Sequence, residues 1–121
     1  GFSLLADNFQ AGVLYILGGL SSHSALQDVW QSQDGGASWT PQALAADFPA
    51  RAFHIARMYP DGTAMYMLGG QGGDGSAMND VWVSTDLGRT WGQRASFPEA
   101  RHSFGAVFDS SGVLVVLGGA P

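Results

Sequence analysis

The chain contains no cysteine and no lysine, and ten acidic residues outnumber its five arginines, which gives a net charge of −5. Without cysteine there is no disulfide, no thiolate metal site and no cysteine nucleophile. Without clustered Lys or Arg the chain offers no basic patch for nucleic-acid phosphates or for an anionic membrane surface. Its longest apolar runs, such as 113–117, are far too short to span a membrane. We therefore expect neither nucleic acid nor a membrane as a partner.

A sustained apolar period of 3.6 residues is also missing. Short apolar runs alternate instead with clusters of Gly, Asp, Asn and Ser, which is the pattern of strands and turns. Nine Asp with one Glu and no Lys fit the same interpretation, because Asp caps turns while Lys and Glu favour helices. The composition therefore predicts an all-β fold.

A segment of about 50 residues is repeated along the chain. Leu-Gly-Gly at 17–19 returns at 68–70 and 117–119, and Asp-Val-Trp at 28–30 returns at 80–82. Such a period marks an architecture in which each repeat is one supersecondary unit. The strands that we predict are 2–7, 13–17, 26–32 and 38–43, then 54–59, 64–68, 78–84 and 90–95, then 103–108 and 113–117. They form two four-stranded antiparallel units, at about 2–44 and 52–96, and half of a third at about 102–119.

The pattern resembles the kelch repeat, in which a double glycine follows the second strand, an aromatic ends the third, and an Arg leads into the next unit. The matching residues are Gly18-Gly19, Gly69-Gly70 and Gly118-Gly119, the aromatics Trp30, Trp39, Trp82 and Trp91, and the arginines Arg51 and Arg101. The resemblance covers residues 1–121 and implies β-propeller blades of four antiparallel strands, about two and a half of them, similar to the central domain of galactose oxidase. Two and a half blades cannot close a ring, so we expect a fragment of a longer propeller, with a domain-swapped oligomer as the alternative.

A second motif, S-x-D-x-G-x-x-W, occurs at the same place in both complete repeats and resembles the Asp-box, or BNR, motif. Its members are Ser32, Asp34, Gly36, Trp39, Ser84, Asp86, Gly88 and Trp91. The Asp and Ser side chains can hold the turn, Gly supplies a backbone angle that other residues resist, and Trp can fill the space between sheets. We interpret the motif as structural rather than ligand-binding.

Two candidate sites remain. Arg51, His54, Arg101 and His102 lie where neighbouring blades would meet a central channel, and they form a possible ligand site at its mouth; the alternative is that both arginines bond loop carbonyls between blades. Asp74, with Asn79 and Asp80 nearby, offers oxygen ligands suited to Ca²⁺ but matches no known loop motif, so a solvated turn is favoured. We expect no catalytic residue, no metal and no cofactor in this chain.

Two functions agree with these motifs. The first is a non-catalytic propeller, a scaffold that recognises a protein or a glycan, or packs against the remaining blades. The second is part of a carbohydrate-acting propeller enzyme, similar to galactose oxidase or to the sialidases, whose catalytic residues lie mostly outside this chain. The Asp-box resemblance favours an extracellular or lumenal location.

Overall fold

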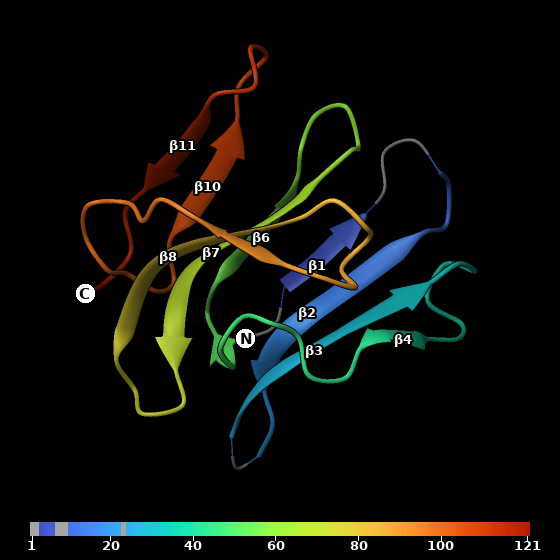
Figure 1. The fold of residues 1–121 in the computed structure, drawn as a ribbon, viewed down its shortest axis with the longest axis horizontal. Coiled ribbons are helices and arrows are strands. Elements are labelled where there is room, and N and C mark those ends of the chain that lie inside the picture. The colour runs from blue at the N-terminus through green and yellow to red at the C-terminus, as the bar shows by residue number, and fades with distance from the viewer. Residues whose placement is uncertain (1–2, 7–9, 23) are drawn as a thin grey trace.

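The computed structural model describes residues 3–6, 10–22 and 24–121, and over these residues the chain is all-β with antiparallel pairing and no helix (Figure 1). The all-β prediction is therefore confirmed. No helix that could cross a membrane occurs in the described part. The strands are β1 (Ser3–Ala6), β2 (Leu14–Leu20), β3 (Ala25–Ser32), β4 (Thr40–Ala43), β5 (Arg51–Ala52), β6 (Ile55–Met58), β7 (Met65–Gly72), β8 (Ala77–Ser84), β9 (Gly92–Arg94), β10 (Gly105–Phe108) and β11 (Leu114–Leu117).

The strands form two meanders and a hairpin. Strands β1 to β4 pair in sequence order as the first meander, and β6 to β9 do the same as the second meander. The C-terminal hairpin is β10 with β11, paired only with each other among the described strands. The two-residue strand β5 bridges the meanders, because Arg51 pairs with Leu26 of β3 and with Gly72 of β7.

We had predicted that each double glycine follows the end of its strand, and this is wrong for the first two pairs, 18–19 and 69–70. Strands β2 and β7 continue past them, with a bulge between Leu17 and Gly19 and between Leu68 and Gly70. Gly70 has a φ of +101°, and a Cβ on it would lie 2.7 Å from the Ala52 carbonyl oxygen. Glycine is needed here because the segment 52–54 crosses directly over the bulged backbone.

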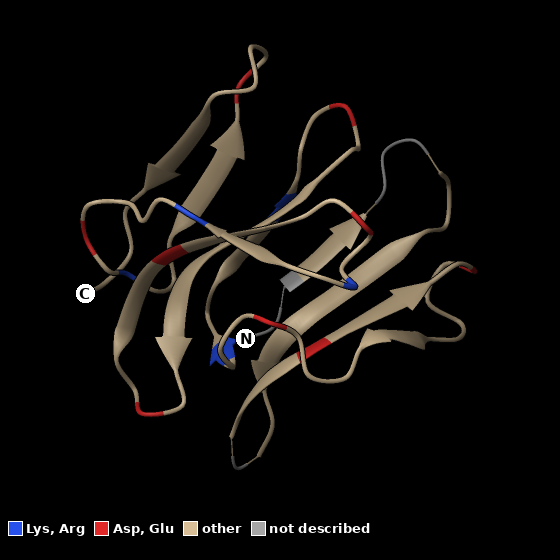
Figure 2. Ribbon diagram, viewed as in Figure 1, with Lys and Arg blue, Asp and Glu red and all other residues tan. Residues whose placement is uncertain are grey.

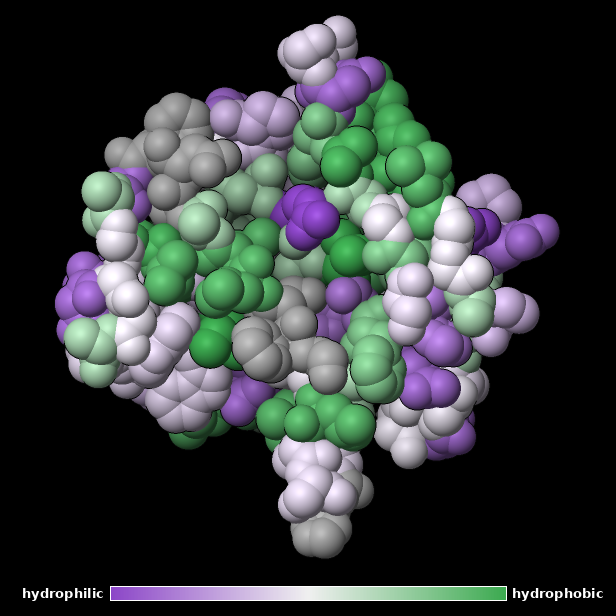
Figure 3. All heavy atoms as spheres, turned by 180° about the vertical axis from the view of Figure 1, so that it is seen from behind, coloured by the Kyte–Doolittle hydropathy of each residue, from purple (hydrophilic) through white to green (hydrophobic). Residues whose placement is uncertain are grey.

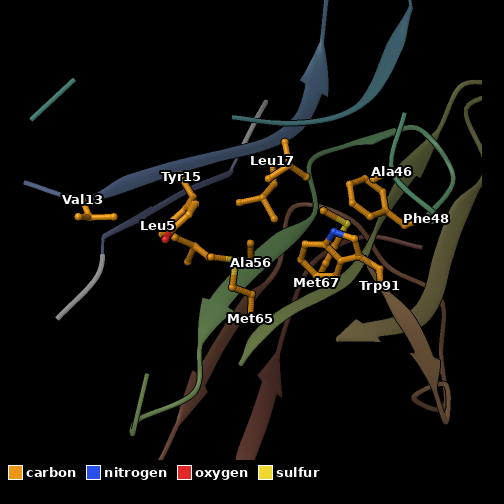
Figure 4. Close-up of a cluster of buried hydrophobic side chains, with 11 residues drawn as sticks. Leu5, Val13, Tyr15, Leu17, Ala46, Phe48, Ala56, Met65, Met67 and Trp91 are labelled. Carbon is orange, nitrogen blue, oxygen red and sulfur yellow. The ribbon is translucent and has the colours of Figure 1, made fainter. Parts of the chain in front are cut away.

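The larger core lies between the two meanders. Every second side chain of β2 points toward the second meander, which contributes Met65 and Met67 of β7 to the same core (Figure 4). The segment between the two meanders adds Ala46 and Phe48. Its buried members are Leu5, Val13, Tyr15, Leu17, Val29, Ala46, Phe48, Ala56, Met65, Met67 and Trp91. Face-to-face packing of the meanders is thus the main apolar contact of the fold.

A second core repeats this arrangement between the second meander and the C-terminal hairpin. Its buried members are Leu68, Val81, Phe104 and Ala106, with Ile55, Tyr66, Phe97, Leu114 and Val116 packed against them. Tyr66 and Tyr59 each make an edge contact with Phe108, at 5.2 Å between ring centroids. The C-terminal hairpin therefore packs on the second meander as the second meander packs on the first.

The C-terminal hairpin presents the corresponding face to the outside. Leu17, Leu68 and Leu117 occupy the same register position, opposite the first residue of the paired strand. Their exposed fractions are 0%, 1% and 58%. Val107 and Val115 are exposed beside Leu117, and apolar side chains gather over this hairpin in Figure 3.

Candidate functional site

The two Asp-box hairpins have the same internal hydrogen bonds. Ser32 Oγ donates to the Asp34 carboxylate and accepts from the Gly36 amide, both at 2.8 Å. Asp34 also accepts from the Ser38 amide at 2.9 Å and from the Ser38 hydroxyl. In the second hairpin, Ser84, Asp86, Gly88 and Thr90 repeat every one of these bonds.

These bonds fix the charge of both carboxylates. Hydrogen bonds from the Ser38 side chain and amide lower the pKa of Asp34 to about 2. Burial opposes the shift at Asp86, but bonds from Thr90 and Ser84 still lower its pKa. Both groups are ionised and engaged in their own turns, an arrangement that suits holding a hairpin.

The surroundings of the two hairpins differ. Trp91 is 6% exposed, meets the Phe48 ring edge-on at 5.3 Å, and donates from Nε1 to the Gly88 carbonyl. A Cβ on Gly88 would lie 2.7 Å from Val29 Cγ1, so this hairpin packs directly on β3 of the first meander. Trp39 is only partly buried, since no described segment covers the first hairpin in the same way.

The shorter of the two ion pairs in the described residues joins a fully buried Arg51 to a partly buried Asp80. Arg51, fully buried, donates from Nη1 and Nη2 to the two carboxylate oxygens of Asp80 at 2.6 and 2.7 Å. The same guanidinium donates to the carbonyls of Gly69 and Pro49. Burial raises the pKa of Asp80, but the bonds from Arg51 and from Trp82 Nε1 outweigh it, so the pKa is lowered overall.

His54 lies beside this ion pair and between the two double-glycine segments. A Cβ on Gly70 would lie 2.8 Å from His54 Cβ, and one on Gly18 would lie 3.2 Å from His54 Cε1. Burial, helped by the charge of Arg51, lowers the pKa of His54 to about 4. The imidazole is therefore neutral near pH 7 and tightly packed, which does not suit a proton-transfer role.

The C-terminal counterparts are closer to the surface. Arg101 donates from Nη1 to the Gly118 carbonyl, and the His102 ring lies 6.3 Å from that of Phe53 and 3.1 Å from the Ser103 hydroxyl. Of the four residues in the predicted channel-mouth site, only Arg101 lines either of the two surface pockets described below. The structure thus buries Arg51 and His54 and leaves Arg101 and His102 partly exposed.

The first pocket, of about 220 Å³, lies at the end of β11 and is lined by Arg101, Gly118, Gly119 and Pro121 among others. The second, of about 170 Å³, lies between the β2–β3 and β7–β8 loops. Leu20 and Phe53 are exposed at its edge, and Gly72 and Gly73 form part of its wall.

Acidic residues lie in several turns and in strands β3 and β8 (Figure 2). Within the described ranges no three His, Cys, Asp or Glu residues come together as metal ligands. The two carboxylates considered for Ca²⁺, those of Asp74 and Asp80, already have other partners. Asp74 accepts from the Ser76 amide and hydroxyl, and the bonds from Ser76 lower its pKa. Asp80 faces Arg51 instead of the loop that holds Asp74.

Sequence reasoning missed the role of Asp80. The signal was present in the repeated Asp-x-Trp, since residues two apart on a strand share a face. In both repeats the Trp Nε1 donates to that Asp, at 2.9 Å for Asp28 and 2.7 Å for Asp80. Which Arg meets which Asp across 29 residues was not readable from the sequence.

Comparison with known proteins gives two partial similarities, and no family model matches the chain. The chain is 32% identical over 78 residues to multiple epidermal growth factor-like domains protein 8 of Homo sapiens. It is 33% identical over 72 residues to the dynein alpha chain of the flagellar outer arm of Chlamydomonas reinhardtii. These matches cover 64% and 58% of this chain but only 3% and 2% of those proteins, so the chain spans a very small part of the relatives it matches.

Proposed function

We propose that this chain is part of a kelch-like β-propeller with Asp-box hairpins, about two and a half blades long, that acts as a non-catalytic recognition scaffold. The observation that carries the proposal is the repeated packing of one four-stranded unit on the next. Leu17 in the first meander and Leu68 in the second are buried at the same register position by the unit that follows. Stacking of like units through like positions is how repeat scaffolds bury a core.

A longer parent protein agrees with two further observations. Both matched relatives are far longer than this chain. Val107, Val115 and Leu117 leave an apolar face exposed at the C-terminal hairpin, which is costly for an isolated domain. We therefore favour a fragment of a longer propeller over a domain-swapped oligomer.

The non-catalytic part of the proposal rests on how the candidate groups are used. Asp34 and Asp86 hold their hairpins, and Arg51 and His54 are buried in packing contacts. None of these four groups is positioned to act on a bound substrate. An enzyme similar to galactose oxidase or the sialidases would need its reacting groups from elsewhere in the parent protein.

The recognition surface that we propose lies at the loop end that carries the β2–β3 and β7–β8 turns (Figure 1). Its pocket of about 170 Å³ has exposed Leu20 and Phe53 at the edge. Phe53 has a φ of +56°, a conformation that bulky residues rarely adopt, and its side chain is exposed beside the pocket. An exposed aromatic side chain beside a small pocket suits a protein partner.

The test uses site-specific photo-crosslinking in the parent protein. A crosslinking side chain at position 53 should give a discrete protein adduct, whereas one at Val113, exposed in the turn at the opposite end, should give none. Phe53→Ser should remove binding without unfolding, because Ser103 adopts the same backbone conformation at the equivalent position, with a φ of +55°. Equal adducts from both positions, or sugar turnover by the parent protein that depends on residues of this chain, would contradict a non-catalytic recognition role.

A further inference from the structure

The guanidinium groups of Arg51 and Arg101 make equivalent hydrogen bonds to the backbone. Arg51 donates from Nε to the carbonyl two residues earlier at 3.2 Å and from Nη1 to the first glycine of the Leu-Gly-Gly segment at 2.9 Å. Arg101 makes the same two bonds, at 3.3 and 2.9 Å. Each guanidinium carbon also lies 5.9 Å from the ring of the Phe three or four residues earlier.

The two arginines differ in their carboxylate partner. Arg51 has the two-pronged contact with Asp80. The carboxylate that the structure places near Arg101 is that of Glu99, with 4.0 Å between the nearest N and O atoms and an 85% exposed side chain. A contact of that length and exposure is weak, so Arg101 has no close carboxylate partner among the described residues.

Strand β8, which carries Asp80, has no counterpart beside β11 among the described strands. Asp80 belongs to β8, which pairs with one edge of β7 while β6 pairs with the other. Strand β11 holds the position of β7 in the third repeat, and among the described strands it pairs with β10 alone. The edge of β11 that corresponds to the β8 side of β7 is therefore open, which leaves backbone donors and acceptors available to another strand.

A pocket joins these two features. Its volume is about 220 Å³, and its walls include Arg101 together with Gly118 and Gly119, which follow β11 directly. In the second repeat, the Gly69 carbonyl and the Asp80 carboxylate meet the guanidinium at the corresponding place. The pocket is thus where a strand with an Asp in the position of Asp80 would put its carboxylate.

We propose that Arg101 and the open edge of β11 form a strand-acceptor site for an extended Asp-x-Trp segment. The occupant is a strand equivalent to β8, the third strand of the incomplete third repeat, which adds to the β11 edge while its Asp binds Arg101 as Asp80 binds Arg51. The Trp two residues later holds that carboxylate, as Trp82 does for Asp80. Main-chain pairing supplies affinity and the ion pair sets the register. The proposal rests on the repeat architecture of the proposed function.

The test adds a fluorescent peptide with the sequence of residues 77–84 to the 121-residue chain and measures fluorescence anisotropy. We expect saturable 1:1 binding and slowed amide exchange in Leu114–Leu117. A peptide with Asp80→Asn should bind at least tenfold more weakly. Arg101→Gln in the chain should cause a similar loss for the native peptide and no further loss for the Asn peptide. Arg101→Lys keeps the charge and should restore the affinity only in part, because it lacks the fork geometry.

Arg94→Gln, which removes another exposed arginine, is the matched control and should leave binding unchanged. Equal affinity for the Asp and Asn peptides, protection at β1 or β4 instead of β11, or self-association of the peptide-free chain through this edge would overturn the acceptor site. Phe53→Ser should not affect peptide binding. Absent peptide binding with intact crosslinking at position 53 therefore rejects the acceptor site alone, and the reverse result rejects the recognition role alone.

Discussion

Trp39 and Trp91 hold the same place in two copies of one motif, so replacing each by Ala tests the packing of the meanders directly. Trp91 is buried against Phe48 and the first meander, while Trp39 is only partly buried. The two variants make the same chemical change in equivalent hairpins. Their difference in the free energy of unfolding therefore reports what the neighbouring meander contributes.

The magnitude follows from burial. A buried Trp side chain removes about 150–250 Å² from water, which at about 25 cal/mol/Å² corresponds to about 4–6 kcal/mol. Alanine keeps a small part of that area, so Trp91→Ala should lower the stability by about 3–5 kcal/mol. Because Trp39 lacks the covering meander, Trp39→Ala should cost about 1–2 kcal/mol.

Urea unfolding followed by circular dichroism is the suitable assay, since four Trp residues complicate fluorescence. Trp91→Phe is a milder control that keeps an aromatic ring and removes the bond from Nε1 to Gly88, at about 1 kcal/mol for the bond itself. A loss below about 1 kcal/mol for Trp91→Ala would refute its core placement. Equal losses for the two Ala variants would refute the argument that the neighbouring meander makes the difference.

Three further predictions concern stability. Arg51→Ala should cost about 3–5 kcal/mol in urea unfolding because it leaves a partly buried carboxylate without its partner, whereas Arg101→Ala should cost about 1 kcal/mol or less; equal losses would contradict the buried ion pair. Gly70→Ala should cost about 2 kcal/mol or more, since its φ is positive and its Cβ would meet a carbonyl, while Gly73→Ala has open space and should be nearly neutral. Burial holds the pKa of His54 at about 4, below the ordinary 6.5, so the folded state binds fewer protons; stability should be full above pH 6.5 and fall by up to about 3 kcal/mol as the pH drops to 4. His54→Gln should flatten that part of the pH profile, and an unchanged slope would show that other groups cause it.

Local patterns predicted the strands well where neighbours in sequence also pair in space. Strand β6, the turn at 59–63 and β7 were all expected from an apolar run, Pro-Asp-Gly, and a second apolar run. The third strand of each repeat was expected from alternation, and Val81 and Val83 are indeed more buried than Trp82 between them. The pairing of two strands in a hairpin depends on the residues of the strands and of the short turn between them, so it can be predicted from the sequence.

Pairing between distant segments was not predictable in the same way. Strand β5 has two residues, and it exists because Arg51 pairs with Leu26 and Gly72, which are 25 and 21 residues away. The double glycines were expected to follow the second strands, but Gly69-Gly70 lies at a bulge within β7 that the segment of β5 and His54 crosses. A local pattern shows that glycine is present and does not show which backbone approaches it.

The candidate site shows the same division. Both Asp-box motifs read alike, and their internal hydrogen bonds are alike, because each bond joins residues two to four apart. The partner of Arg51 was not found, since its contact with Asp80 depends on how β5 lies against β7 and β8. Burial of His54 depends on the same crossing.

By itself, the sequence determined the all-β class, the approximate position of most strands and the form of the hairpin turns. These follow from the alternation of apolar residues and from turn chemistry over a few residues. Only the tertiary structure decided which of two equal Trp side chains is buried, which Arg has its Asp, and which apolar face lies open at the C-terminal hairpin. The physical reason is that identical motifs make identical local bonds, while burial depends on whether another unit packs beside them.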